Sequence, residues 1–173
     1  MEIFAAAERL MTMDDRAWAR HANPWSVWSR ATTLPLIALA VWSRVWIGWW
    51  ALIPVALALG WTWLNPRLFP PPRDRDTWPG RGTLGERVWL RRGQIDLPSH
   101  HVRAAWVLTA TSAFGAVPLV WGLVVLDAGW TICGIALVAG PKLWFVDRMV
   151  WLHQDMTGIA PGTPILDPKG ALP

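Results

Sequence analysis

Two long stretches that are almost free of charge constrain this chain more than any other feature of its sequence. Residues 31–66 contain one charged side chain, Arg44, and residues 104–141 contain one, Asp127. As one straight helix the first stretch would be about 54 Å long, whereas the hydrocarbon core of a bilayer is about 30 Å thick. Each stretch is therefore expected to fold back on itself, the first with a turn between Arg44 and Gly48 and the second near Asp127.

This pattern predicts an all-α integral membrane protein. We expect a four-helix arrangement of two transmembrane hairpins with short interfacial helices, all in a single membrane domain. Its parts are an interfacial N-terminal segment (1–24), a first hairpin (25–64), a cytoplasmic Arg/Pro-rich loop (65–103), a second hairpin with a helical extension (104–156) and a tail (157–173).

The composition agrees with this fold class. Charged residues make up 16% of the chain and hydrophobic residues 53%, whereas soluble domains carry about 25% charged residues. One alternative stays open for the first and fourth apolar segments, which Arg30, Arg44 and Lys142 shorten. These two segments can be re-entrant or interfacial instead of spanning, which leaves two full crossings.

The basic residues predict the orientation. With four crossings, both termini and the central loop share one side, and fifteen of the sixteen Lys and Arg residues fall there, whereas Arg44 alone falls on the other side. The positive-inside rule places these fifteen residues on the cytoplasmic side of the membrane. An outer pair formed by Arg44 and Asp127, one from each outer turn, is a further expectation.

The central loop is expected to contain one short helix. The Asn65-Pro66 dipeptide predicts the end of the preceding span, and Arg73 to Asp76 read as a solvated charge run. Thr83 and Glu86 fit a capping box, which predicts a helix over residues 84–92. Pro98 or Ser99 is expected to begin the third span.

Histidine is the first candidate for chemistry. The chain has His21, His100, His101 and His153, and the carboxylates Asp14, Asp15, Asp147 and Asp155 are near enough to the same membrane face to join a metal site. No two of these residues have the sequence spacing of a known metal motif, and neighbouring His100 and His101 are expected on different faces of a helix. We therefore predict no metal site and no cofactor. Interfacial histidines bound to water or headgroups are the expected alternative.

The segment that follows the fourth span carries the strongest polar cluster. On a helix, Asp147, Trp151 and Asp155 share one face, and Met149 and His153 share another. Arg148 and Asp147 can grip a headgroup phosphate or move a proton at the membrane border. The other interpretation is a solvated helix end that Trp151 anchors at the interface.

A lipid-headgroup site on the cytoplasmic face is therefore one functional hypothesis. Its candidate residues are polar or cationic and border the predicted spans: Asn23, Arg30, Arg67, Arg87, Asp147, Arg148 and His153. The lipid bilayer is the expected partner, together with a membrane protein or a second copy of the chain. Nucleic acid is not expected, because acids interleave with the arginines of the loop.

Four strings carry a resemblance to a known family: 21–30 (HANPWSVWSR), 63–72 (WLNPRLFPPP), 81–87 (RGTLGER) and 145–151 (FVDRMVW). With these strings the chain resembles an uncharacterised family of small, Trp-rich prokaryotic integral membrane proteins, known as a domain of unknown function. The likeness covers about residues 14–156. It implies a single membrane domain and carries over no catalytic or binding residue.

Three functional classes remain. The absence of nucleotide-binding, hydrolase and redox motifs favours a non-catalytic accessory or scaffold protein, or a lipid-binding protein, over an enzyme. A membrane enzyme with a cytoplasmic-face site around Asp147, Arg148 and His153 is the alternative. An oligomeric transporter or channel is the third class, and few polar residues of the spans would serve it: Thr109, Thr111, Ser112 and Thr131.

Overall fold

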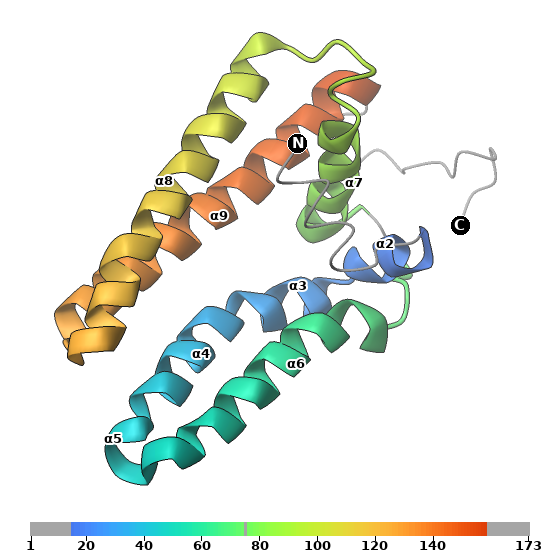
Figure 1. Ribbon diagram of the computed structural model, residues 1–173. Coiled ribbons are helices and arrows are strands. Elements are labelled where there is room, and N and C mark those ends of the chain that lie inside the picture. The colour runs from blue at the N-terminus through green and yellow to red at the C-terminus, as the bar shows by residue number, and fades with distance from the viewer. Residues whose placement is uncertain (1–14, 75, 159–173) are drawn as a thin grey trace. The chain divides into compact units, whose positions relative to one another are not determined.

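The chain is helical throughout the part that the structure describes. The computed structural model describes residues 15–74 and 76–158 (Figure 1), and every regular element in these ranges is a helix. The predicted interfacial helix over the first residues lies largely outside the described residues. The helices are α2 (Asp15–His21), α3 (Pro24–Ala31), α4 (Thr33–Trp42), α5 (Arg44–Ile47), η1 (Gly48–Ala51), α6 (Leu52–Leu68), α7 (Trp78–Leu90), α8 (Ser99–Val125) and α9 (Ala128–Thr157).

The helices are divided between two compact units. Unit 1 consists of the described parts of residues 1–27, 66–102 and 146–173. Unit 2 consists of residues 28–65 and 103–145. The boundaries fall inside α3, α6, α8 and α9, so these helices contribute residues to both units.

Three helical segments are long and apolar enough to cross a membrane: Pro24–Asn65, Ser99–Val125 and Ala128–Thr157. The first segment has 42 residues and is interrupted by α5 and η1. Gly48 turns the chain there with a φ of 56°, which glycine adopts without strain. Figure 1 shows α4 and α6 running antiparallel on either side of this turn. The predicted turn between Arg44 and Gly48 is confirmed.

Helices α8 and α9 approach each other closely in unit 2. Three buried glycines, Gly115, Gly122 and Gly134, supply the space. A Cβ at Gly115 would lie 2.7 Å from the Leu137 carbonyl carbon, and one at Gly134 would overlap the backbone of Leu119. The Ser112 hydroxyl also donates a 3.0 Å hydrogen bond to the Val138 carbonyl. Small residues at such crossings are typical of membrane helix pairs, because lipid offers the helices no hydrophobic force to associate.

The turn between α8 and α9 does not contain the expected ion pair. The Arg44 guanidinium instead donates hydrogen bonds of 2.6 and 2.8 Å to the carbonyls of Leu123 and Val124, at the C-terminal end of α8. Asp127 begins α9 by accepting a 2.8 Å hydrogen bond from the Trp130 amide. Each charged side chain therefore binds backbone groups at a helix end, where these groups have no partner within the helix.

Helix α7 begins earlier than the sequence predicts. It starts at Trp78, and the side chain of Thr77 accepts a 3.3 Å hydrogen bond from the Gly80 amide as its cap. The predicted cap Thr83 lies inside the helix and donates its hydroxyl to the Pro79 carbonyl at 2.9 Å. Pro79 suits the first turn, where its missing N–H would have had no partner. A second difference is that α6 continues past the Asn65-Pro66 dipeptide, whereas the predicted start of α8 at Ser99 is confirmed.

The core of unit 1 lies between α7 and the last part of α9. Trp89, Met149 and Leu152 are its largest fully buried apolar side chains. Gly85 of α7 lies so close to α9 that a Cβ there would overlap the carbonyl oxygen of Met149, and Gly82 faces Val146. Glycine at these positions lets the two helices approach at backbone distance, and this contact positions the polar residues described next.

Candidate functional site: the polar residues of unit 1

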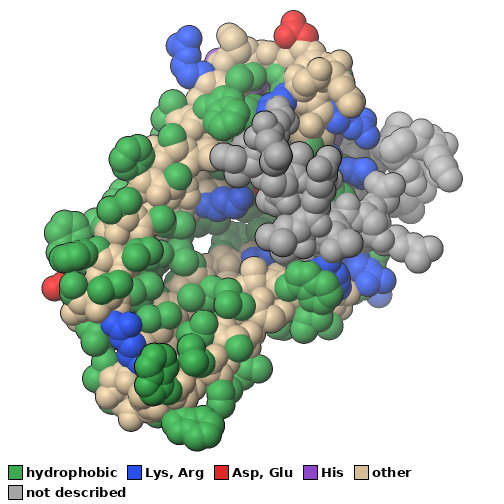
Figure 2. Space-filling model, in the orientation of Figure 1, with side chains coloured by type: hydrophobic (Ala, Val, Ile, Leu, Met, Phe, Trp, Pro, Cys, Tyr) green, Lys and Arg blue, Asp and Glu red, His purple; other side chains and the backbone are tan. Residues whose placement is uncertain are grey.

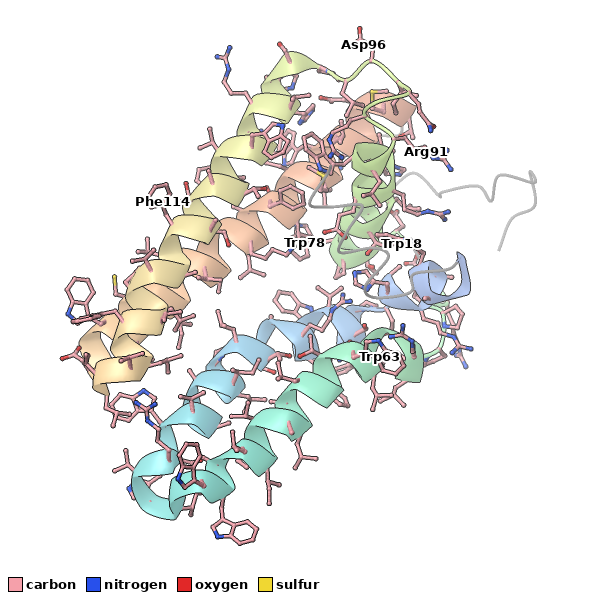
Figure 3. All side chains as sticks on the ribbon, viewed as in Figure 1. Trp18, Trp63, Trp78, Arg91, Asp96 and Phe114 are labelled. Atoms are coloured by element: carbon pink, nitrogen blue, oxygen red, sulfur yellow. The ribbon has the colours of Figure 1, made fainter. Side chains whose placement is uncertain are left out.

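Helix α9 presents two different faces within unit 1, as its sequence predicts. Met149 and His153 are buried, whereas Trp151 and Asp155 are exposed. Asp147 lies one helical turn before Trp151, and its Oδ1 accepts a 2.9 Å hydrogen bond from the indole Nε1 of Trp78. Figure 3 labels Trp78 on α7. The carboxylate therefore joins α9 to the first residue of α7.

A buried ion pair stabilises the start of α7. Arg81 is 4% exposed, and both its Nε and an Nη contact Oδ1 of Asp76. A buried guanidinium is costly unless a carboxylate compensates its charge. The sequence does not predict this pair, because Asp76 belongs to a run of alternating charges, and such a run is typical of a solvated segment.

His153 is the most unusual polar residue of this core. The residue is 5% exposed, and neither ring nitrogen has a hydrogen-bond partner among the described residues. It lies on the C-terminal part of α9, in unit 1 and within the segment Ala128–Thr157 that is long and apolar enough to cross a membrane.

The remaining polar cluster joins α8 to α9. His101 Nε2 lies 2.8 Å from Asp155 Oδ2, and His100 Nε2 lies 3.8 Å from the same oxygen. The two imidazole rings are 4.1 Å apart between centroids. We expected these two neighbours on different faces of the helix. They do differ in burial, since only His101 is buried, but both rings lie near the same carboxylate.

The segment before α3 is tied to the end of α6 by hydrogen bonds to backbone carbonyls. Asn23 Nδ2 donates to the Pro70 carbonyl at 2.9 Å, while its Oδ1 accepts from the Trp25 amide at 2.9 Å. Arg20 donates to the Arg67 carbonyl at 2.9 Å. Asn23 therefore caps α3 with its side-chain oxygen, while its amide nitrogen holds the Pro70 carbonyl.

Comparison with protein families identifies the family of this chain. The model of a family of unknown function, DUF6653, matches residues 4–171, nearly the whole chain. The chain belongs to this family. The predicted membership of an uncharacterised family is confirmed, and every candidate residue above lies within the matched range. No curated protein and no solved structure matches the chain.

Within this DUF6653 chain, the seven candidate headgroup residues have different surroundings. All except Arg30 belong to unit 1. Asn23 and Asp147 hold neighbouring segments together, and His153 is buried. Arg67 and Arg87 are half-buried and make other interactions. Arg148 is half-buried and has no hydrogen-bond or ion-pair partner in the described part of the chain. Their common role in lipid binding stays a prediction.

Proposed function

We propose that this protein crosses the inner membrane of a prokaryotic cell four times, as two hairpins, with both termini and residues 66–102 in the cytoplasm. The first hairpin comprises α3–α4 and α6, and the second comprises α8 and α9. The distribution of charge supports this topology. Unit 2 contains five charged residues, Arg30, Arg44, Arg103, Asp127 and Lys142, and all other charged residues and all four histidines belong to unit 1.

The surface of unit 2 supports its placement in lipid. Among the large hydrophobic side chains that are exposed, all but Trp25, Leu68, Trp151 and Met156 belong to unit 2. Figure 2 shows hydrophobic side chains spread over the visible surface of α4, α6 and α8. Phe114, labelled in Figure 3, is 77% exposed on α8. An apolar surface of this extent is unfavourable in water and suits contact with acyl chains.

The helix lengths support a membrane crossing by the first apolar segment, although Arg30 and Arg44 shorten its charge-free part. The first span begins at Pro24, before Arg30, and α3 and α4 together extend to Trp42 with an interruption at Thr32. A helix over residues 24–42 is about 28 Å long, close to the hydrocarbon thickness. Arg30 then lies near one end, from which a long side chain can reach the headgroups.

Within this topology, the role best supported is that of a non-catalytic accessory or scaffold protein of a membrane complex. The observation that carries this proposal is how the polar side chains of unit 1 are used. Asp147 binds Trp78 and Asn23 binds the Pro70 carbonyl, so each of these two residues holds two segments together. Asp76 binds Arg81 and stabilises the start of α7. Groups committed to internal hydrogen bonds support a rigid unit that presents a surface to a partner.

Lipid-headgroup binding is the second candidate, and Arg148 favours it. Its guanidinium follows the apolar part of α9 directly and has no partner in the described ranges. A cation at this border is attracted to the anionic inner leaflet by about 1 kcal/mol. Asp147 forms no ion pair with Arg148 in the described part of the chain, and its Oδ1 accepts the hydrogen bond from the Trp78 indole instead.

Native mass spectrometry of the protein, extracted with its surrounding lipid patch, tests the accessory role. We expect a discrete heteromeric mass that contains this chain and a partner in fixed stoichiometry. A monomer or a homo-oligomer as the only species would contradict the accessory role. The topology would stand in that case, because it is tested separately.

The same spectra test the lipid site. Anionic lipid should remain bound to the wild type, and Arg148→Gln should reduce the retained lipid. Arg91→Gln is the matched control, because Arg91 is an exposed arginine of the same unit, on the segment after α7 (Figure 3). Equal lipid retention in the wild type and the Arg148 variant would exclude Arg148 as the binding residue.

A further inference from the structure

Three side chains that commonly bind metals meet in unit 1, where the first turn of α8 lies beside the last turns of α9. The ligand atoms of His100, His101 and Asp155 all lie within 4.8 Å of one another. The two histidines are adjacent in the sequence, but Asp155 is 54 residues from His101. No local motif indicates this cluster, since only the packing of the two helices creates it.

We propose that His100, His101 and Asp155 bind a divalent transition-metal ion, with Zn²⁺ as the preferred ion. Two imidazole nitrogens and one carboxylate oxygen are a donor set that suits zinc. Ligand atoms around a tetrahedral zinc ion lie about 3.3–3.5 Å apart, given bond lengths of about 2.0–2.2 Å. The two N–O distances of 2.8 and 3.8 Å bracket this separation, so small side-chain rotations admit the ion.

His101 is the fixed member of the proposed site. The residue is 1% exposed, so the surrounding side chains hold its ring in place. Its Nδ1 has no hydrogen-bond partner among the described residues. Without an ion, Nε2 carries the ring proton and donates it to Asp155 Oδ2, because a carboxylate oxygen accepts. When an ion binds, this proton moves to Nδ1, which has no competing partner among the described residues, and the lone pair of Nε2 becomes available for the metal.

His100 and Asp155 are the adjustable members and leave the site open to solvent. Their side chains are 65% and 48% exposed, respectively. An ion can therefore enter from water, and three protein ligands leave a fourth position of a tetrahedral zinc ion for a water molecule. The single carboxylate disfavours Mg²⁺, which prefers an environment made of oxygen ligands.

A bound ion would connect the start of α8 to the end of α9 within unit 1. Any ligand that binds only the folded state raises stability in proportion to the logarithm of its concentration over its Kd. Zn²⁺ should therefore stabilise the folded protein, and this effect does not depend on any partner or on lipid binding.

The test uses the full-length protein without an affinity tag, in detergent, after removal of metal with a chelator. Zn²⁺ alone is titrated, and bound metal is measured by elemental mass spectrometry beside the unfolding temperature. We expect one equivalent of Zn²⁺ and a rise in unfolding temperature, with no rise in a parallel titration with Mg²⁺. Failure to retain one equivalent, or equal stabilisation by Mg²⁺, would overturn the proposal.

Three variants assign the ion to this cluster. His100→Gln and Asp155→Asn should each weaken Zn²⁺ binding by at least about tenfold, since even residues behind the ligands change metal affinity by about 10–100-fold. His21→Gln is the matched control: His21 is a half-buried histidine of the same unit, 3.9 Å from Glu86. It should bind Zn²⁺ as the wild type does.

His100 is exposed, so its replacement should leave the fold intact, and circular dichroism in the presence of chelator verifies this. Wild-type affinity in both His100→Gln and Asp155→Asn would place the ion elsewhere and contradict the proposal. Weaker binding in His21→Gln, to the same degree as in His100→Gln, would contradict it as well.

Discussion

The indole Nε1 of Trp78 donates a 2.9 Å hydrogen bond to Oδ1 of Asp147, two residues that are 69 positions apart in the sequence. The bond joins the N-terminal end of α7 to α9 just after its apolar part. Asp147 is one of the residues that the sequence suggests for a headgroup site. Its bond to Trp78 gives it a structural role, which predicts an effect on stability before any effect on binding.

Asp147→Ala should lower the free energy of unfolding by about 1 kcal/mol, because the Trp78 indole loses its acceptor in a half-buried position. Trp78→Phe removes the other partner. A double-mutant cycle with thermal unfolding measures the coupling between the two residues. Arg148→Ala serves as the neighbouring control and should have a smaller effect. Additive single effects, with no coupling, would contradict a structural role for this bond.

Gly85→Ala should destabilise the protein by about 1–3 kcal/mol, since an added methyl group forces α7 away from the Met149 carbonyl. Gly93→Ala is the matched control, because no atom lies within 4 Å of a Cβ at that position. Thermal unfolding followed by circular dichroism compares the two variants. Equal unfolding temperatures would show that α7 and α9 do not approach as closely as described.

Arg44→Gln should lower stability by about 0.3–1 kcal/mol, because the carbonyls of Leu123 and Val124 lose a cation at the C-terminal end of α8. Arg44→Lys should fall between the wild type and Arg44→Gln, since it keeps the charge but not the forked donors. Asp127→Asn distinguishes this account from an ion pair. If Arg44 were paired with Asp127, the effects of Arg44→Gln and Asp127→Asn would not add.

His153→Leu should leave the unfolding temperature unchanged or raise it. An apolar side chain of similar size removes two buried nitrogens that lack partners in the described ranges, and such a replacement is neutral or stabilising. His101→Leu, measured with chelator present, should lower the temperature because it removes the 2.8 Å contact with Asp155. A large loss of stability in His153→Leu would show that the ring has a structural partner.

Sequence patterns predict the features of this fold that depend on local composition. The single charges Arg44 and Asp127 mark the two turns of unit 2, because a charged residue is tolerated at the end of a span and not in its middle. Helical periodicity also predicts that Met149 and His153 share a face, and the structure shows that this face is buried. Both inferences need only the spacing of residues along the chain.

Features that depend on distant partners were not predictable in this way. The capping-box pattern of Thr83 and Glu86 predicts a helix that begins at Leu84. The helix begins at Trp78 instead, because Gly82 and Gly85 allow α7 to pack closely against α9. The His101–Asp155 contact was not predictable either, because it joins two helices at positions 54 residues apart in the sequence. Tertiary contacts override local signals at each of these points.

Cysteine labelling in intact membranes tests the four-crossing topology most directly. In a Cys133→Ala background, single cysteines replace Ser43 and Ala128, at the two turns of unit 2, and Arg73 and Gln94, between α6 and α8. A membrane-impermeant thiol reagent should label positions 43 and 128 in intact cells and positions 73 and 94 only after permeabilisation. Labelling of all four positions from one side of the membrane would contradict the account.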